Sequence, residues 1–202
     1  MTWETYTAFL LFVIVMTGTP GVGNLTMMAI GQTSGFRSSL PFLAGTTVGA
    51  IFLDTLVGFG VGGVLLATPE LAWAMKIGGM GYILYLGWKI LSMRPDAART
   101  KGPLSFWEGV FVHPTNPKSW AMAVVGFSQI ATPEMSLPLQ VAVYVLTFTV
   151  FQISFHSLWG WGGVVLYHSL KSNRLRLMVN SVLVALMVGA TMYALFLDTP
   201  HA

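Results

Sequence analysis

The sequence contains no cysteine and few charged residues. With no cysteine among its 202 residues, the chain cannot form disulfide bonds or thiolate metal sites. Asp, Glu, Lys and Arg make up only 8% of the chain, whereas 54% is hydrophobic; an average soluble domain has about 25% charged residues. Apolar stretches longer than about 18 residues recur, and this length crosses a bilayer as a helix. We therefore expect a helical membrane protein surrounded by lipid.

The chain also lacks a recognisable leader and the common catalytic signatures. No basic segment precedes the first apolar run, near Tyr6, so we expect the first helix to be retained. No Gly-x-Ser-x-Gly elbow, phosphate-binding loop, His-Glu-x-x-His or paired-carboxylate signature occurs. The four histidines are dispersed, which argues against transition-metal selectivity. We therefore expect neither enzyme activity nor a cofactor or metal site. We also expect no nucleic-acid partner despite the net charge of +3, because the basic residues are distributed by predicted membrane side.

Apolar runs and the residues that interrupt them predict an all-α polytopic membrane protein with six transmembrane helices. The expected helices cover residues 6–30, 40–67, 71–93, 104–130, 137–166 and 175–197 of a single transmembrane domain, 1–202. The longest connection, 94–103, separates two halves of three helices each, approximately 1–98 and 99–202. An odd number of helices per half predicts two inverted repeats, as in many transporters. The symmetry is a hypothesis, since no residue-level repeat connects the halves.

Basic residues gather on one predicted side of the membrane. They are Arg37, Lys89, Arg94, Arg99, Lys101, Lys171, Arg174 and Arg176. The other side holds Lys76 and the acids Glu4, Glu70, Glu134 and Asp198. Because cytoplasmic loops carry the excess of Lys and Arg, both termini are predicted to be periplasmic in a bacterial inner membrane.

The first expected helix is interrupted by Pro20, Gly21 and Gly23, which are followed by Asn24. Proline removes a backbone hydrogen bond and glycine relaxes the helix, so amides and carbonyls are freed within the bilayer. Freed groups are tolerated there only where protein or a wet cavity satisfies them. Such a place can bind a zwitterionic ligand, and we assign these four residues to substrate binding.

The fourth expected helix has a similar interruption at Thr115, Asn116 and Pro117, followed by Lys118. A lysine about ten residues into a span costs at least about 2.5 kcal/mol, so we expect it to face the interior and pair with an acid, a carbonyl or a substrate carboxylate. We assign these four residues to substrate binding as well. The alternative is a pair of kinks near a helix end, with Lys118 extending to the interface.

Polar residues in two further helices are candidates for a role in transport. Asp54 lies in the second helix, where the small residues Gly45 and Gly49 allow another helix to pack closely. Its carboxylate could exchange a proton, act as the counter-ion of a buried lysine, or form a purely structural ion pair. Gln152 and His156 share a face of the fifth helix. Either could contact substrate, and His156 could relay protons or join helices.

The combined motifs resemble the lysine exporter and homoserine/threonine exporter family (LysE/RhtB) along nearly the whole chain. They are Thr19-Pro20-Gly21, Gly35-Phe36-Arg37, Gly45 with Gly49, the run GYILYLGWK at 81–89, and Asn116-Pro117-Lys118. Asp54 is similar to an acidic residue of the family's second helix. One departure concerns the family's Pro-Gly-Pro-Asn sequence, because Val22 and Gly23 separate Pro20-Gly21 from Asn24 in this chain.

The resemblance implies an inner-membrane exporter of amino acids or close derivatives, driven by proton antiport. Residues 35–39 and 105–107 are similar to the subgroup that handles cysteine, O-acetylserine, homoserine or threonine. Substrate and protons are then the expected partners, and a homodimer is left open. Three alternatives remain: an exporter of metal ions or other small solutes on the same scaffold, an intramembrane enzyme using Asp54 and His156, and a structural membrane subunit.

Overall fold

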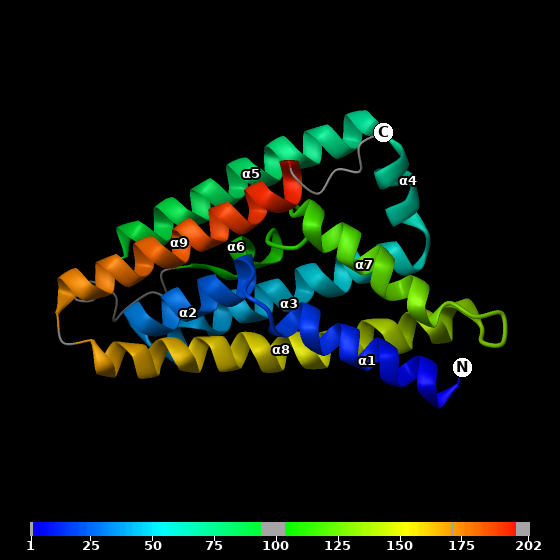
Figure 1. The fold of residues 1–202 in the computed structure, drawn as a ribbon, viewed down its shortest axis with the longest axis horizontal. Coiled ribbons are helices and arrows are strands. Elements are labelled where there is room, and N and C mark those ends of the chain that lie inside the picture. Colours follow the sequence, from blue (N-terminus) through cyan, green and yellow to red (C-terminus); the bar gives the residue numbers. More distant parts are fainter. Residues whose placement is uncertain (1, 94–103, 171, 197–202) are drawn as a thin grey trace.

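A computed structural model describes residues 2–93, 104–170 and 172–196, and the regular structure in these ranges is helical (Figure 1). The helices are α1 (Trp3–Gly18), α2 (Val22–Ser34), α3 (Phe36–Gly58), α4 (Val61–Ala67), α5 (Pro69–Ser92), α6 (Phe106–Val110), α7 (Pro117–Ile130), α8 (Leu137–Ser169) and α9 (Asn173–Phe196). The all-α prediction is confirmed for the described part of the chain.

Three of the expected helices are each divided into two. The first consists of α1 and α2, which meet at 47° across residues 19–21, as the proline and glycines there predicted. The fourth consists of α6 and α7, separated by the turn that contains Pro114. The division between α3 and α4 was not predicted. It occurs at Gly60, whose φ of 93° is a left-handed conformation that glycine adopts readily.

The number of membrane spans agrees only partly with the sequence prediction. By length and composition, α3, α8 and Asn173–Tyr193 of α9 can each cross a membrane, and α1 with α2 can form a fourth, bent span. Helix α7 has only 14 residues, or about 21 Å of helix. Glycines and lysines lower the hydropathy of α5. The six-span inverted repeat therefore remains a prediction.

The helix ends sort into two groups along the molecule (Figure 1). The start of α1 and the α4–α5 and α7–α8 turns lie toward one end, whereas the α2–α3 turn and the junction of α8 with α9 lie toward the other. Glu4, Glu70 and Glu134 lie on elements of the first group. Arg37 follows the α2–α3 turn and Arg174 and Arg176 lie at the start of α9, in the second group. Lys89 lies in the last turn of α5, which ends toward the same side. The remaining charges of the predicted sides, Arg94, Arg99, Lys101, Lys171 and Asp198, lie outside the described residues.

Helix α2 lies at the centre of the bundle. Eleven of its 13 residues are buried, from Val22 to Thr33. It packs closely on α8, where Gly31 lies against the Gly160 carbonyl group and Gly163 lies against that of Met28. Side chains at either glycine would collide with backbone atoms. This packing buries the start of α2, whereas Thr19 and Pro20 in the α1–α2 break are exposed.

Helix α6 packs equally closely on α3. Gly45 faces the Phe106 carbonyl group, Gly49 faces that of Val110, and Gly109 on α6 faces that of Phe42. Small residues let two helix backbones approach each other. The two glycines assigned to helix packing from the sequence thus lie on the α3–α6 contact, which places the start of the α6–α7 segment beside the centre of the bundle.

Candidate functional site: a cavity between two helix breaks

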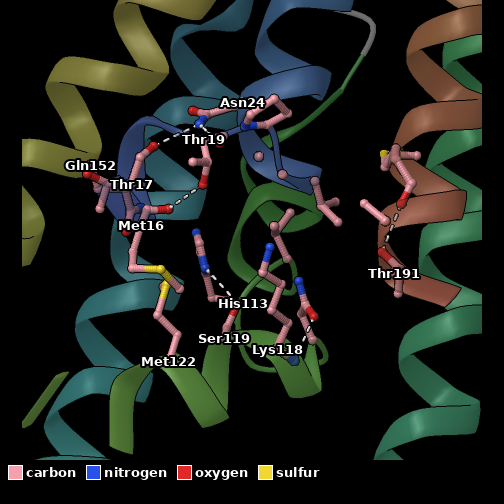
Figure 2. Close-up of a pocket in the computed structure, with 18 of the residues that line it drawn as sticks. Met16, Thr17, Thr19, Asn24, His113, Lys118, Ser119, Met122, Gln152 and Thr191 are labelled. Carbon is pink, nitrogen blue, oxygen red and sulfur yellow. Dashed lines mark hydrogen bonds between the residues drawn. The ribbon is translucent and has the colours of Figure 1, made fainter. Parts of the chain in front are cut away.

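A cavity lies where the α1–α2 break faces the α6–α7 segment, with walls completed by α8 and α9 (Figure 2). About 70 Å³ of it is open to the centre of a water molecule, which is room for several waters. Eight of the ten residues assigned to substrate binding line it: Pro20, Gly21, Gly23, Asn24, Asn116, Lys118, Gln152 and His156. The structure therefore brings together residues from three predicted helices.

Thr115 and Pro117 have other positions. The Thr115 hydroxyl donates to the Phe111 carbonyl group at 2.6 Å, and the Thr115 carbonyl group lies against Gly79 of α5. Pro117 occupies the first turn of α7, where its missing N–H would have had no partner within the helix. Neither lines the cavity, and both lie at the backbone break between α6 and α7.

Asn24 closes the α1–α2 break. Its Nδ2 donates to the carbonyl groups of Thr17 and Thr19, each at 2.8 Å. Those carbonyl groups lack helical partners because α1 ends at Gly18. The two donations commit both hydrogens of the amide, and the buried Oδ1 has no hydrogen-bond partner in the described chain. Despite the departure from the family sequence, Asn24 has a well-defined place at the break.

Gly23 makes room for His156. A Cβ atom on Gly23 would collide with Nε2 of the His156 ring. The ring is 4% exposed, and its Nδ1 has no partner among the described residues. The sequence placed His156 and Gln152 on one face of α8, and both line the cavity. Gln152 also donates from Nε2 to the Thr46 carbonyl group at 3.3 Å, which joins α8 to α3.

His113 was not assigned a role from the sequence, yet it lies on the cavity wall. Its ring centroid is 6.0 Å from that of His156, and its Nδ1 lies 3.2 Å from Ser119 Oγ. Nε2 is buried without a partner in the described chain. The available signal was its position directly before Pro114, inside a span that prolines interrupt. Nothing in the sequence indicated that it would meet a histidine of α8.

Lys118 is held at the start of α7 by its neighbour. Asn116 caps the helix, with its Oδ1 accepting from the Lys118 backbone N–H at 3.0 Å. The side chain of Lys118 is half-buried, and its ammonium group has no hydrogen bond or ion pair among the described residues. Figure 2 shows the His113 and Lys118 side chains extending from the α6–α7 segment toward the break that holds Thr19 and Asn24. The cavity thus contains an uncompensated cation.

Asp54 is buried outside this cavity. It is 5% exposed, and its Oδ1 lies 3.2 Å from the Tyr144 hydroxyl, which also lies 3.1 Å from the Ala123 carbonyl group. No ion pair joins Asp54 to Lys118 in the described part of the chain, so the counter-ion alternative is not what the structure shows. The carboxylate finds a hydroxyl on α8 because the packing of α3 against α7 and α8 places Tyr144 beside it.

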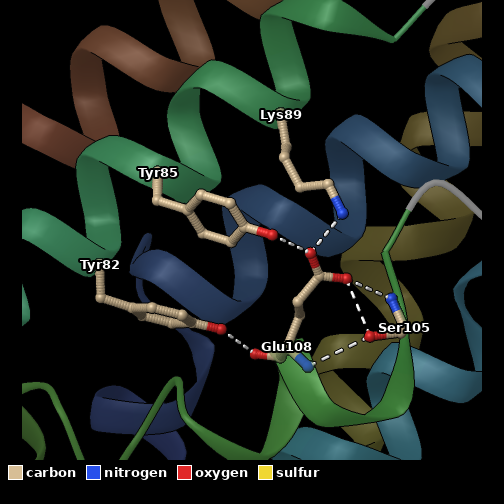
Figure 3. Close-up of polar contacts among 5 residues, drawn as sticks. All are labelled: Tyr82, Tyr85, Lys89, Ser105 and Glu108. Atoms are coloured by element: carbon tan, nitrogen blue, oxygen red, sulfur yellow. Dashed lines mark hydrogen bonds and ion pairs between the residues drawn. The ribbon is translucent and has the colours of Figure 1, made fainter.

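A second polar cluster, the Glu108 cluster, joins α5 to the start of α6 (Figure 3). Ser105 and Glu108 form a capping box, and Glu108 also pairs with Lys89 and accepts from the Tyr85 hydroxyl at 2.6 Å. The Tyr82 hydroxyl donates to the Glu108 carbonyl group. Every polar group drawn in Figure 3 has a partner. Glu108 was not noticed in the sequence, although Ser105 followed three residues later by an acid is a capping-box signature.

Within the described ranges, no group of three or more His, Cys, Asp or Glu side chains could hold a metal ion. Residues 14–197 match the family described as LysE type translocator. No solved structure matches the chain.

Two curated relatives are similar over most of their length. A cysteine/O-acetylserine efflux protein of Escherichia coli O1:K1 is 28% identical over 136 residues, which cover 66% of this chain and 69% of the relative. A homoserine/homoserine lactone efflux protein of Salmonella typhimurium is 30% identical over 156 residues, 72% of each chain.

Proposed function

The chain belongs to the LysE type translocator family, and from this premise we propose that it exports a small amino acid, or a close derivative of one, across the bacterial inner membrane. The relatives named for efflux of cysteine, O-acetylserine and homoserine support this substrate class. The cavity between the two breaks is the proposed binding site.

The observation that carries this proposal is the state of the polar groups around the cavity. Asn24, His113 and His156 each hold a buried polar atom without a partner in the described chain, and the Lys118 ammonium group lies beside them unpaired. Leaving a buried polar atom unsatisfied costs about 1–3 kcal/mol, so such atoms normally have a ligand or water to bind. A molecule with both an anionic and a hydrogen-donating group matches this set.

We propose alternating access as the transport mechanism, with the cavity opening to one side of the membrane at a time. Lys118 would attract the substrate carboxylate. Gly45 and Gly49 would let α6 slide along α3, because no side chain at either position obstructs the contact between the two helix backbones. The concentration of Arg and Lys at one end of the bundle supports the cytoplasmic assignment of that end, with both termini periplasmic.

Asp54 is the proposed point of proton coupling. A protonated carboxyl group becomes a donor as well as an acceptor. Protonation would therefore change its hydrogen bond with Tyr144, whose hydroxyl also contacts the Ala123 carbonyl group of α7. In this way a proton on α3 would alter the packing of α7, the helix that carries Lys118.

Reconstitution of the purified protein tests the proposal. Proteoliposomes loaded with labelled homoserine or O-acetylserine should exchange the label for unlabelled amino acid. Proteoliposomes without internal label should accumulate the labelled amino acid against its gradient only when a proton gradient is imposed. Asp54→Asn should keep exchange but lose accumulation. Failure of the wild type to move either amino acid would overturn the proposal, and full accumulation by Asp54→Asn would remove Asp54 from coupling.

A further inference from the structure

Three hydrogen-bond acceptors of the cavity residues are left without partners. Asn24 Oδ1, His113 Nε2 and His156 Nδ1 are all buried and unpartnered in the described chain. The three residues come from α2, the α6–α7 segment and α8, and all line the same cavity. Three unsatisfied polar atoms around one cavity would be a large cost in a protein without a ligand.

The local hydrogen bonds determine what Asn24 can bind. Its amide nitrogen already donates twice, to the Thr17 and Thr19 carbonyl groups at 2.8 Å each. Carbonyl groups only accept, so the nitrogen must be the atom that faces them. The remaining polar atom is therefore a carbonyl oxygen, which can only accept. Its natural partner is a hydrogen-bond donor.

The two histidines can act as acceptors in the same place. When His113 Nδ1–H donates to Ser119 Oγ, 3.2 Å away, Nε2 is left with a lone pair. The His156 ring is close enough, at 6.0 Å between centroids, only because Gly23 lacks a Cβ atom in its path. An imidazole keeps one bare nitrogen while it is neutral. In the tautomers that leave His113 Nε2 and His156 Nδ1 bare, the neutral pair and Asn24 offer three acceptors, the number of hydrogens on a primary ammonium group.

The charges around the cavity restrict the ligand further. The titratable groups that line it are Lys118, His113 and His156, and no Asp or Glu lines it among the described residues. Asp54 lies behind Tyr144, outside the lining. A carboxylate would neutralise Lys118, but a second ammonium group on the ligand would meet no acid. A ligand with one carboxylate and one ammonium group adds no net charge.

We propose that Asn24, His113 and His156 form the subsite for the ammonium group of a zwitterionic monoamino acid, and that the cavity rejects diamino acids. This inference rests on the proposed export function and adds the orientation of the substrate. The carboxylate lies at Lys118 and the ammonium group lies at the α1–α2 break. His113 is thereby a specificity residue that no sequence motif indicated.

Binding to the purified protein tests this subsite with three probes. Homoserine carries both groups, 4-hydroxybutyrate lacks the ammonium group, and lysine carries a second one. Wild-type protein should bind homoserine at least about tenfold more tightly than either of the others, because a hydrogen bond to a charged group is lost or a charge is left unpaired. Isothermal titration calorimetry gives the three affinities.

Variants of His113 separate hydrogen bonding from packing. His113→Leu should weaken homoserine binding about tenfold or more while leaving the affinity for 4-hydroxybutyrate unchanged, because only the ammonium group loses an acceptor. His113→Gln retains an acceptor and should recover most of the affinity. His168→Leu is the matched control, since His168 is an exposed histidine of α8 outside the cavity. Thermal unfolding of each variant shows whether it folds. If His113→Leu does not fold, His156→Leu and His156→Gln repeat the comparison.

The outcomes distinguish the two proposals. If the wild type neither binds nor transports homoserine or O-acetylserine, the export function fails and this subsite fails with it. If the wild type transports homoserine but also binds lysine equally well, or if His113→Leu binds homoserine like the wild type, the subsite is wrong and the exporter stands. Loss of homoserine binding alone in His113→Leu, recovered in His113→Gln, supports the subsite.

Discussion

Two regions of the bundle hold polar side chains between helices: one is the cavity at the two helix breaks, and the other is the Glu108 cluster. The hydrogen bonding of these two regions differs. In the Glu108 cluster the carboxylate accepts from a lysine, a tyrosine and a serine, so its charge is compensated (Figure 3). In the cavity an ammonium group and three buried acceptors have no partners among the described residues (Figure 2). The comparison separates a polar cluster that joins helices from the proposed substrate site, whose polar groups have no partners in the described chain.

The largest effect should come from removing the unpaired charge. Lys118→Met retains the length of the side chain but removes the ammonium group, and should weaken homoserine binding about 10- to 100-fold, because a charged hydrogen bond to the carboxylate is lost. Lys76→Met is the control, since Lys76 lies over the Trp73 ring and does not line the cavity. Calorimetry and exchange in proteoliposomes measure both. Equal homoserine affinity of Lys118→Met and the wild type would contradict the proposal that the unpaired ammonium group in the cavity binds the substrate.

A smaller loss should follow from filling the space beside His156. Gly23→Ala should reduce homoserine affinity about tenfold, because the new Cβ atom forces the imidazole away from its position. Gly81→Ala is the control: Gly81 lies within α5, does not line the cavity, and has no atom within 4 Å of an added Cβ. If both variants behave alike, the approach of His156 to Gly23 is unimportant for binding.

In the Glu108 cluster, the expected change is in stability. Glu108→Gln should lower the free energy of unfolding by about 1 kcal/mol, because Lys89 loses its negatively charged partner. For a chain of this size, this corresponds to a fall of about 2–4 °C in the unfolding midpoint. Homoserine affinity should stay at the wild-type value. The double variant Glu108→Gln/Lys89→Met should lose less stability than the sum of the losses in the two single variants. Weaker homoserine binding in Glu108→Gln would mean that the cluster also serves the site.

The smallest effect should come from the exposed edge of the same cluster. Tyr85→Phe removes a hydroxyl that donates to Glu108 at 2.6 Å on a side chain that is 39% exposed. We expect a loss of about 0.5 kcal/mol, because water replaces this hydrogen bond easily. Tyr82→Phe should cost more, since its hydroxyl donates to a backbone carbonyl group from a half-buried position. The reverse order of unfolding midpoints would contradict this reading of the cluster.

Much of the backbone could be predicted because local chemistry governs it. The breaks at Pro20 and Pro114 could be predicted, since proline lacks an N–H and removes a helical hydrogen bond. The break at Gly60 was missed for the opposite reason. Glycine tolerates a helix interior as well as a turn, and the neighbouring residues are apolar enough to continue a helix.

The contacts of the polar side chains were less predictable. Lys118 was recognisable as an interior residue because a charge in a span is costly. The partner of Asp54 was not, because Tyr144 is 90 residues away in the chain. His113 was overlooked because its neighbour His156 lies on a different helix, α8, and only the folded bundle brings the two rings together.

From its amino acids alone, this chain is recognisable as a helical membrane protein with two interrupted helices and a lysine beside one of the interruptions, because hydropathy and proline chemistry act over a few residues. The meeting of Asn24, His113 and His156 depends on the close packing of α2 against α8 and of α6 against α3. Glycines permit those contacts, but a glycine in a sequence does not specify which helix will approach it. The cavity and its unpaired acceptors are therefore properties of the folded bundle.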